Sequence, residues 1–302
     1  MIAFEGVLFF PVTPFDAADH VDLGLLDEHV AERLDHAPGG VFPACGTGEF
    51  NALDAAEVAA VVAQTVRTVA GRVPVVAGTG GQLAHARSCA RSAADAGADA
   101  LLVLPPYLVG GPVAGLVAYV EAVAASSPLP VIVYHRGTAQ YTAAAMARLA
   151  ANPKVIGFKD GTGDVALAQD IVTAVTATGR TDFQFFNGLL TAELSQAAYR
   201  GLGIPLYSSA VFAMAPRIAT AFYRAYTDGD EAARERLLRE FYFPLSRLRD
   251  TTPGYGVSLV KAGVRLGGLD AGPVRAPLAD PTPEHLARLV ELLAAGEALL
   301  GA

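Results

Sequence analysis

The stretch "LPVIVYHRGTAQYTAAAMARLAANPKVIGFKDGTGD", residues 129–164, contains two short apolar runs separated by an alanine-rich segment. The first run ends at Tyr134 and the second at Lys159, each just before glycines and charged residues. Thr142 directly precedes the alanine-rich segment, where its hydroxyl can cap a helix. A buried strand, a helix and a second buried strand make the unit from which parallel sheets are built. We therefore predict one strand–helix–strand unit over these residues.

The same alternation extends over most of the chain. Helix-start signals lie between the runs: Asp54 with Glu57 three residues later resembles a capping box, and Asp164 can cap the following segment. Eight evenly spaced units predict a (β/α)8 barrel, a fold that needs about 250 residues. The alternative is a doubly wound open sheet, but the first turn lacks the G-x-G-x-x-G fingerprint. The eight apolar runs begin at Val7, Gly39, Val73, Ala100, Leu129, Lys154, Phe183 and Ile204.

The pattern changes after Asp228. No further apolar run of strand type occurs, and three segments of helical period follow, within residues 230–248, 255–268 and 283–300. We predict that residues 1–228 form the barrel with the active site, and that residues 229–302 form a C-terminal helical extension packed on it.

Composition narrows the classes of function. The chain has 302 residues, 52% of them apolar, and a formal charge of -8 without blocks of like charge. Neither a nucleic-acid footprint nor a basic membrane patch is present, so we expect a small-molecule partner. The two cysteines, Cys45 and Cys89, belong to no C-x-x-C motif or Cys/His cluster, which predicts neither a disulfide framework nor a metal site. The apolar N-terminus lacks a basic start and contains Pro11 and Pro14, so we expect a soluble, cytoplasmic protein.

Lys159 is the main candidate for catalysis. Active sites of (β/α)8 barrels lie at the carboxyl ends of the strands, and Lys159 follows the apolar residues "VIGF". Burial lowers the pKa of a lysine amine, which prepares it to attack a carbonyl carbon. The alternatives are an ion pair with Asp160 or Asp164, or a phosphate clamp. Because adjacent strand residues point to opposite faces, Asp160 is expected to point away from Lys159.

Two neighbouring strand ends supply further candidates. Tyr134 lies one strand away from Lys159, where its phenol could move protons to and from the reacting carbon, although it could also be an ordinary strand-end aromatic. The segment "CGTGE", residues 45–49, offers backbone N–H groups around Gly46 and the hydroxyl of Thr47. Such a nest suits a carboxylate, and the alternative is a tight turn without a ligand.

The remaining strand ends carry polar residues that suit a hydroxylated acid. Arg136 could clamp a second carboxylate or form a salt bridge at the rim. We expect Asn187, Ser208 and Ser209 to donate hydrogen bonds at the barrel mouth. No role is assigned to His135, which should point away if Tyr134 points inward, or to Cys45, which we read as a small buried residue. The histidines form no metal constellation.

The motifs resemble the dihydrodipicolinate synthase and N-acetylneuraminate lyase superfamily of Schiff-base barrels. The resemblance runs in order over nearly the whole length and implies that Lys159 forms the Schiff base and that Tyr134 shuttles protons. It further implies that Gly46 and Thr47 hold the carboxylate next to the keto group, while Ser208, Ser209 and Asn187 meet the distal end. The matching motifs are "PVTPF", the G-T-G-E turn, "LPPY", the strand-five tyrosine, "GFKD" and "VKAGVRLGG".

Within the superfamily, the combination of motifs is most similar to the decarboxylating dehydratases of glucarate and galactarate breakdown, which act on a keto-deoxy sugar diacid. That branch implies no cofactor and a homotetramer or homodimer. Leu108 stands where the synthases usually have a second tyrosine, which argues against synthase activity. His135 stands where the dehydratases usually have asparagine. The motifs that carry this likeness are "FPACGTGEF", "LLVLPPYL", "GFKDGTGD", "NGLLTAE" and "YSSAVF".

Two other functions stay open at this point. A 2-keto-3-deoxy sugar acid aldolase would use the same lysine and tyrosine but break a carbon–carbon bond. A non-catalytic sugar-acid sensor would keep the pocket without turnover.

Overall fold

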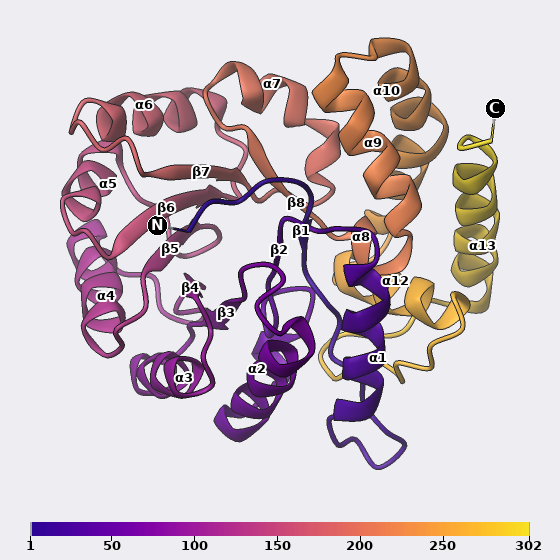
Figure 1. Ribbon diagram of the computed structural model, residues 1–302, viewed down its shortest axis with the longest axis horizontal. Helices are drawn as coiled ribbons and strands as arrows, with labels where there is room; N and C mark the ends of the chain where they lie inside the picture. Colours follow the sequence, from indigo (N-terminus) through magenta and orange to yellow (C-terminus); the bar gives the residue numbers. More distant parts are fainter. Residues whose placement is uncertain (1, 302) are drawn as a thin grey trace.

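The computed structural model describes residues 2–301. Eight parallel strands form a ring in the order β2-β1-β8-β7-β6-β5-β4-β3, and helices surround it (Figure 1). A parallel bridge between Val41 and Val75 brings the two ends of the ring together. The structure thus confirms the predicted (β/α)8 barrel and excludes the open doubly wound sheet.

Each strand lies within one of the eight predicted apolar runs. The runs form strands because their residues are buried both by the barrel interior and by the surrounding helices, which favours apolar side chains on both faces. The strands are β1 (Leu8–Phe9), β2 (Gly40–Val41), β3 (Val76–Thr79), β4 (Ala100–Val103), β5 (Val131–His135), β6 (Val155–Asp160), β7 (Gln184–Asn187) and β8 (Leu206–Ser209).

Helices connect the strands, and the predicted caps start three of them. The Asp54 side chain accepts hydrogen bonds from the first turn of α2, and Glu57 completes the capping box. Thr142 caps α5 and Asp164 caps α6 in the same way. The helices of this part are α1 (Leu23–Leu34), α2 (Ala55–Val69), α3 (Leu83–Asp95), α4 (Val113–Ala125), α5 (Ala143–Ala150), α6 (Val165–Thr176), α7 (Gln196–Gly201), α8 (Val211–Met214) and α9 (Pro216–Asp228), with 3-10 turns η1 (Phe50–Ala52) and η2 (Ala192–Leu194).

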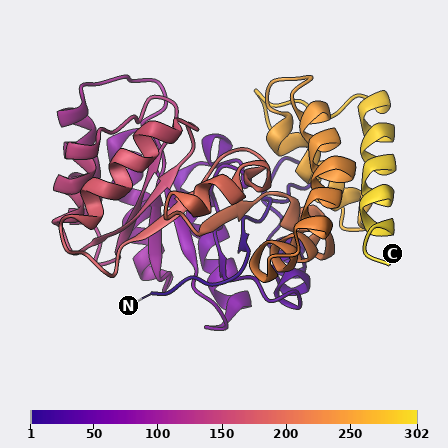
Figure 2. The ribbon, with the colours of Figure 1, turned by 90° about the horizontal axis from the view of Figure 1, so that it is seen from above.

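The chain beyond Asp228 is helical, as predicted. Within residues 2–301 no strand follows β8, and the last helices gather on one side of the barrel (Figure 2). α13 packs on α11, α12 and η3. The boundary between barrel and extension after Asp228 stays a prediction. The elements are α10 (Glu231–Leu237), the π-helical turn η3 (Leu238–Tyr242), α11 (Phe243–Arg249), α12 (Tyr255–Leu266) and α13 (Pro283–Ala298).

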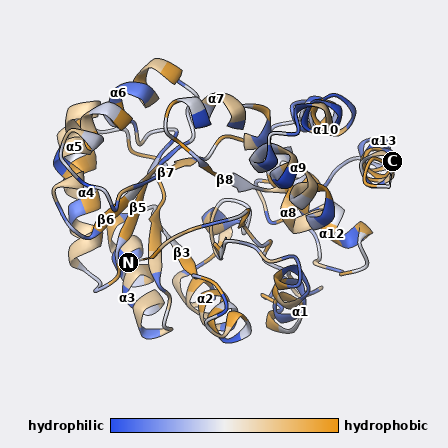
Figure 3. Cartoon of the chain, turned by 45° about the horizontal axis from the view of Figure 1, so that its top comes forward, coloured by the Kyte–Doolittle hydropathy of each residue, from blue (hydrophilic) through white to orange (hydrophobic). Residues whose placement is uncertain are grey.

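The strand register decides which side chains enter the barrel. Tyr134 of β5 pairs with Lys159 of β6, which in turn pairs with Phe186 of β7. Asp160 and Asn187, one residue further on, pair with each other and face the surrounding helices. Apolar residues dominate the central strands, and hydrophilic ones cover much of the outer surface, as on α10 (Figure 3). None of the helices within residues 2–301 is both long and apolar enough to cross a membrane.

Candidate active site

A cavity of about 410 Å³ opens among the carboxyl ends of the strands. It lies where a (β/α)8 barrel is expected to hold its active site. Six of the eight predicted site residues line it. They are Gly46, Thr47, Tyr134, Arg136, Lys159 and Ser208.

Lys159 is buried, with a relative exposure of 5%. Its Nζ lies 4.1 Å from the ring centroid of Phe10 and 4.4 Å from that of Tyr134. Burial of the amine lowers the pKa of Lys159 to about 7, and the nearby charge of Arg136 acts in the same direction. A substantial fraction of the amine is therefore uncharged at neutral pH, as a nucleophile requires.

Asp160 does not pair with Lys159. Its carboxylate points to the other face of β6, where it accepts hydrogen bonds from the backbone N–H groups of Thr162 and Gly163 and from the Tyr199 hydroxyl. The strand alternation that we used on the sequence is confirmed here. The lysine is left without the carboxylate neighbour that would keep it charged.

Two glycines make room for Lys159 and Tyr134. A Cβ atom on Gly188 would lie 2.6 Å from Cε of Lys159 and 2.9 Å from the backbone oxygen of Asp160. A Cβ atom on Gly161 would lie 2.7 Å from Cε2 of Tyr134. Any larger residue at these positions would displace the lysine or the tyrosine, so the glycines permit the close approach.

Tyr134 is held by two hydrogen bonds. Its Oη donates to the backbone oxygen of Gly188 at 2.9 Å and accepts from Nη1 of Arg136 at 2.9 Å. Burial raises the pKa of Tyr134, and the guanidinium of Arg136 opposes that effect by stabilising the phenolate. The phenol thus lies beside the amine of Lys159, in a position to exchange protons with a carbon bound to it.

The segment 45–49 forms a compact turn at the cavity. The backbone N–H of Glu49 donates to the oxygen of Gly46, and the hydroxyl of Thr13 donates to the oxygen of Gly48 at 2.7 Å. Ala44, just before the turn, and Glu49, its last residue, both adopt left-handed backbone conformations, with φ of 49° and 57°. Such strained residues gather at functional sites. The geometry is compatible with the predicted carboxylate nest, which stays a prediction.

The structure does not bring Asn187 or Ser209 to the cavity, which corrects our expectation for both. The Asn187 amide donates to the backbone oxygen of Ala192 and to Gln196 Oε1, outside the barrel. The Ser209 hydroxyl donates to the buried carboxylate of Glu193 at 2.5 Å. Both residues stand one position beyond an inward-facing residue and therefore point the other way. They hold β7 and β8 against η2 instead of meeting a ligand.

His135 and Cys45 occupy the positions expected of them. His135 faces outward, and its Nδ1 accepts the backbone N–H of Tyr141 at 2.9 Å. Cys45 is buried, and burial raises the pKa of its thiol to about 12. The thiol is therefore neutral at physiological pH and too poorly ionised to act as a nucleophile.

Several cavity residues escaped the sequence analysis. Thr138 lies in the loop after β5, and Tyr107 lies in the loop after β4. Only their closeness to a strand end could have indicated them in the sequence. Thr191 has a left-handed φ of 51°, and its hydroxyl accepts a hydrogen bond from Nη1 of Arg249 at 2.6 Å. Gly256 lies in the first turn of α12, so it reaches the cavity from the extension and not from a strand. No local pattern could have placed it there.

The lowered pKa of Lys159 predicts how kcat/KM depends on pH. Attack on a carbonyl needs the neutral amine, so kcat/KM should be level above about pH 8 and fall tenfold per pH unit below about pH 7. Tyr134 stays protonated over this range because its pKa is raised. Measuring kcat/KM from pH 5.5 to 10 checks this. A rate that keeps rising towards pH 10 would show that the lysine titrates normally.

A barrel that buries a lysine of lowered pKa beside a tyrosine at its strand ends defines a lyase of the Schiff-base type. The model of the Dihydrodipicolinate synthetase family matches residues 3–296, and the chain belongs to this family. Solved structures agree in fold. Dihydrodipicolinate synthase from Bacillus clausii has a TM-score of 0.89 at 25% identity, covering 98% of both chains. A prophage protein of the family from E. coli, in complex with pyruvate, has a TM-score of 0.86 at 26% identity, covering 97% of this chain and 99% of that one.

Two relatives that are similar to this chain over nearly its full length carry the same activity in their names. "Probable 5-dehydro-4-deoxyglucarate dehydratase 2" of Streptomyces avermitilis is 52% identical over 298 residues, which is 99% of this chain and 89% of that protein. "Probable 5-dehydro-4-deoxyglucarate dehydratase" of Paracidovorax citrulli is 44% identical over 290 residues, 96% of this chain and 94% of that protein. Both matches include the barrel and the C-terminal helices.

Proposed function

We propose that this enzyme converts 5-dehydro-4-deoxy-D-glucarate to 2,5-dioxopentanoate, water and carbon dioxide. The observation that carries the proposal is the juxtaposition of the Lys159 amine and the Tyr134 phenol in a cavity that also contains the turn 45–49. The names of relatives that are about half identical over nearly the full length support the choice of substrate.

The substrate carries a keto group beside one carboxylate, then a methylene, two hydroxyl-bearing carbons and a second carboxylate. Gly46 and Thr47 bind the carboxylate next to the keto group. The amine of Lys159 adds to the keto carbon. The hydroxyl so formed leaves as water with a proton passed on from the Tyr134 phenol, which leaves an iminium and a Tyr134 phenolate. This cation draws electrons from the neighbouring methylene and makes its protons acidic.

Tyr134 then removes one methylene proton, which gives an enamine. The enamine expels the hydroxyl group one carbon further on, and the proton held by Tyr134 leaves with it as water. The product of this step is an iminium conjugated to a carbon–carbon double bond. During dehydration Tyr134 thus takes up one proton from the methylene and gives it to the leaving hydroxyl.

The conjugated iminium is also the electron sink for decarboxylation. When the distal carboxylate leaves as carbon dioxide, its bonding electrons move through the double bond to the iminium nitrogen. The resulting enol takes up a proton to become an aldehyde, the enamine takes up another, and hydrolysis frees Lys159. The lysine supplies the sink that an organic cofactor provides in other enzymes, so the proposed chemistry needs no cofactor.

Arg136 and Ser208 are proposed to meet the distal part of the substrate. The Arg136 side chain lies in the cavity wall, where one of its five N–H donors already binds Tyr134. Ser208 offers a hydroxyl that donates a long hydrogen bond, 3.4 Å, to the backbone oxygen of Asn187. A guanidinium and a hydroxyl at this end suit a hydroxylated diacid.

Product analysis tests the proposal. With 5-dehydro-4-deoxy-D-glucarate we expect one carbon dioxide and one 2,5-dioxopentanoate per substrate consumed. Release of pyruvate would instead indicate the aldolase on the same scaffold. Saturable binding with neither turnover nor a borohydride-trapped adduct would indicate the sensor.

The loop after β4 supports self-association. Leu108 is 94% exposed and Val109 66%, and both adjoin the cavity residue Tyr107. Exposed apolar side chains in a row are typical of an interaction surface. We propose that the chain forms a homodimer or homotetramer, which light scattering can distinguish from the 31.2 kDa monomer.

A further inference from the structure

A buried ion pair lies directly behind the turn 45–49. Oε1 of Glu49 accepts a hydrogen bond from Nζ of Lys261 at 2.8 Å. Oε2 of Glu49 accepts a hydrogen bond from the backbone N–H of Arg275, also at 2.8 Å. Neither side chain of the ion pair is exposed. Lys261 belongs to α12, and Arg275 belongs to the segment 270–281 between α12 and α13, which we call the strap. The C-terminal part of the chain therefore holds both oxygens of a residue in the turn.

The charges of this pair depend on each other. A buried carboxylate or ammonium is costly unless it has a partner and hydrogen bonds. Burial lowers the pKa of Lys261 to about 8, while Glu49 opposes the change, so the lysine is mostly charged at neutral pH. Its Nζ also lies 3.9 Å from the ring centroid of Phe15. Removing one partner would leave the other uncompensated.

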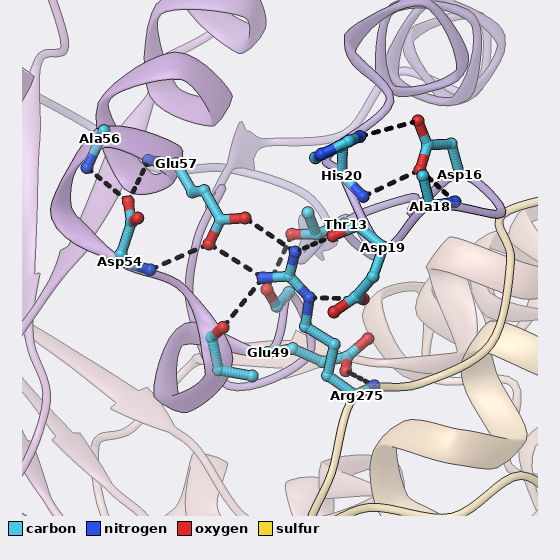
Figure 4. Close-up of polar contacts among 12 residues, drawn as sticks. Thr13, Asp16, Ala18, Asp19, His20, Glu49, Asp54, Ala56, Glu57 and Arg275 are labelled. Carbon is cyan, nitrogen blue, oxygen red and sulfur yellow. Dashed lines mark hydrogen bonds and ion pairs between the residues drawn. The ribbon is translucent and has the colours of Figure 1, made fainter.

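Arg275 fixes the strap in place (Figure 4). Its guanidinium binds both oxygens of Glu57, at 2.8 and 2.7 Å. It also donates to the backbone oxygen of Ala52 at 3.0 Å and to Asp19 at 2.9 Å. These contacts join three separate parts of the barrel. The backbone N–H of Arg275 is consequently presented to Glu49 from a rigid support.

The backbone of Glu49 shapes the turn itself. Its left-handed conformation, with φ of 57°, is unfavourable for a residue with a side chain, so the surroundings must hold it. In that conformation its N–H closes the turn onto the oxygen of Gly46. Gly46 and Thr47, the cavity-lining residues, lie within the turn that this bond closes. The carboxylate of Glu49 is the anchor that keeps the turn closed.

We propose that Glu49 is a positioning residue: held by Lys261 and the strap, it aims the N–H groups of the turn at the carboxylate beside the reacting keto group. The inference rests on the proposed function, because it takes the turn as the site of that carboxylate. It gives Lys261 and the strap a part in substrate recognition although neither Lys261 nor Arg275 lines the cavity.

Trapping with two small ketones can show whether Glu49 positions the turn for a carboxylate or only stabilises the fold. Pyruvate and acetone can both form an iminium with Lys159, and hydride from borohydride reduces that C=N bond to a stable amine. Only pyruvate carries a carboxylate for the turn to bind. A misaligned turn should therefore weaken the response to pyruvate and leave the response to acetone unchanged.

The experiment measures the ketone concentration that gives half-maximal inactivation by borohydride. In Glu49→Gln we expect this concentration to rise roughly 10-fold for pyruvate, the scale of one weakened hydrogen bond to a charged group. For acetone we expect no change, because its trapping does not use the turn. Lys261→Met should behave in the same way. If that variant fails to fold, the double variant Glu49→Gln/Lys261→Met removes both charges together and is measured with the two ketones in its place.

Asp280→Asn is the matched control. Asp280 accepts Nη2 of Arg265 at 3.0 Å, so this pair also joins α12 to the strap but does not touch Glu49. We expect wild-type values for both ketones. Equal shifts for pyruvate and acetone in Glu49→Gln, or no shift for either, would overturn the positioning role. A wild-type enzyme that neither ketone inactivates would instead refute the Schiff base.

Discussion

Replacing Lys159 with methionine should abolish borohydride trapping and lower kcat/KM by about 10⁴- to 10⁶-fold, the scale of losing a covalent nucleophile. Methionine is also unbranched and fills most of the space of the lysine stem, whose Nζ lies against the rings of Phe10 and Tyr134. What it removes is the amine whose pKa is lowered to about 7. Without the iminium, neither the acidity of the methylene nor the sink for decarboxylation exists.

Mass spectrometry of the trapped enzyme checks this prediction. Reduction in the presence of substrate should add the ligand's mass to the peptide that contains Lys159. Lys154→Met is a suitable control because Lys154 lies just before the other end of β6 and its ammonium binds the backbone oxygens of Ala124 and Ser127. That variant should still be labelled. A label on another lysine, or none at all, would contradict the assignment.

Tyr134→Phe should keep the adduct but slow turnover by roughly 10²- to 10⁴-fold, as expected for the loss of general acid–base catalysis. Phenylalanine preserves the ring that packs on Lys159 and fills the space beside Gly161. It removes the hydroxyl that binds Gly188 and Arg136. Iminium formation needs the lysine, whereas removing the methylene proton and protonating the leaving hydroxyl need the phenol.

Separate measurements of trapping and turnover distinguish the two roles. Tyr141→Phe is the control, because Tyr141 is also a buried tyrosine but lies outside the cavity, against His135. It should turn over like the wild type. Unchanged turnover in Tyr134→Phe would remove this residue from the mechanism, and loss of trapping would show that its main effect is on the lysine.

The barrel and the core of its site could be predicted from the sequence. Each strand is a short apolar run. The rule that active sites lie at strand ends predicts that Tyr134 and Lys159 share one cavity, and the structure confirms it. The two-residue period of a strand separated Lys159 from Asp160. The same rule separates Ser208 from Ser209, and the register shows that Asn187 follows Asp160 outward. The alternation correctly predicts the directions of Lys159 and His135, and it also explains why the two wrongly predicted ligands, Asn187 and Ser209, point outward.

The amino-acid sequence by itself thus determined the elements and the residue types at the strand ends, because strand period and helix caps are local properties of the chain. Only the tertiary structure decided what supports that chemistry. Glu49 and Lys261 are 212 residues apart in sequence, and no period or motif links them. Their pairing follows from the burial of two opposite charges, which the packing of the C-terminal helices against the barrel brings together.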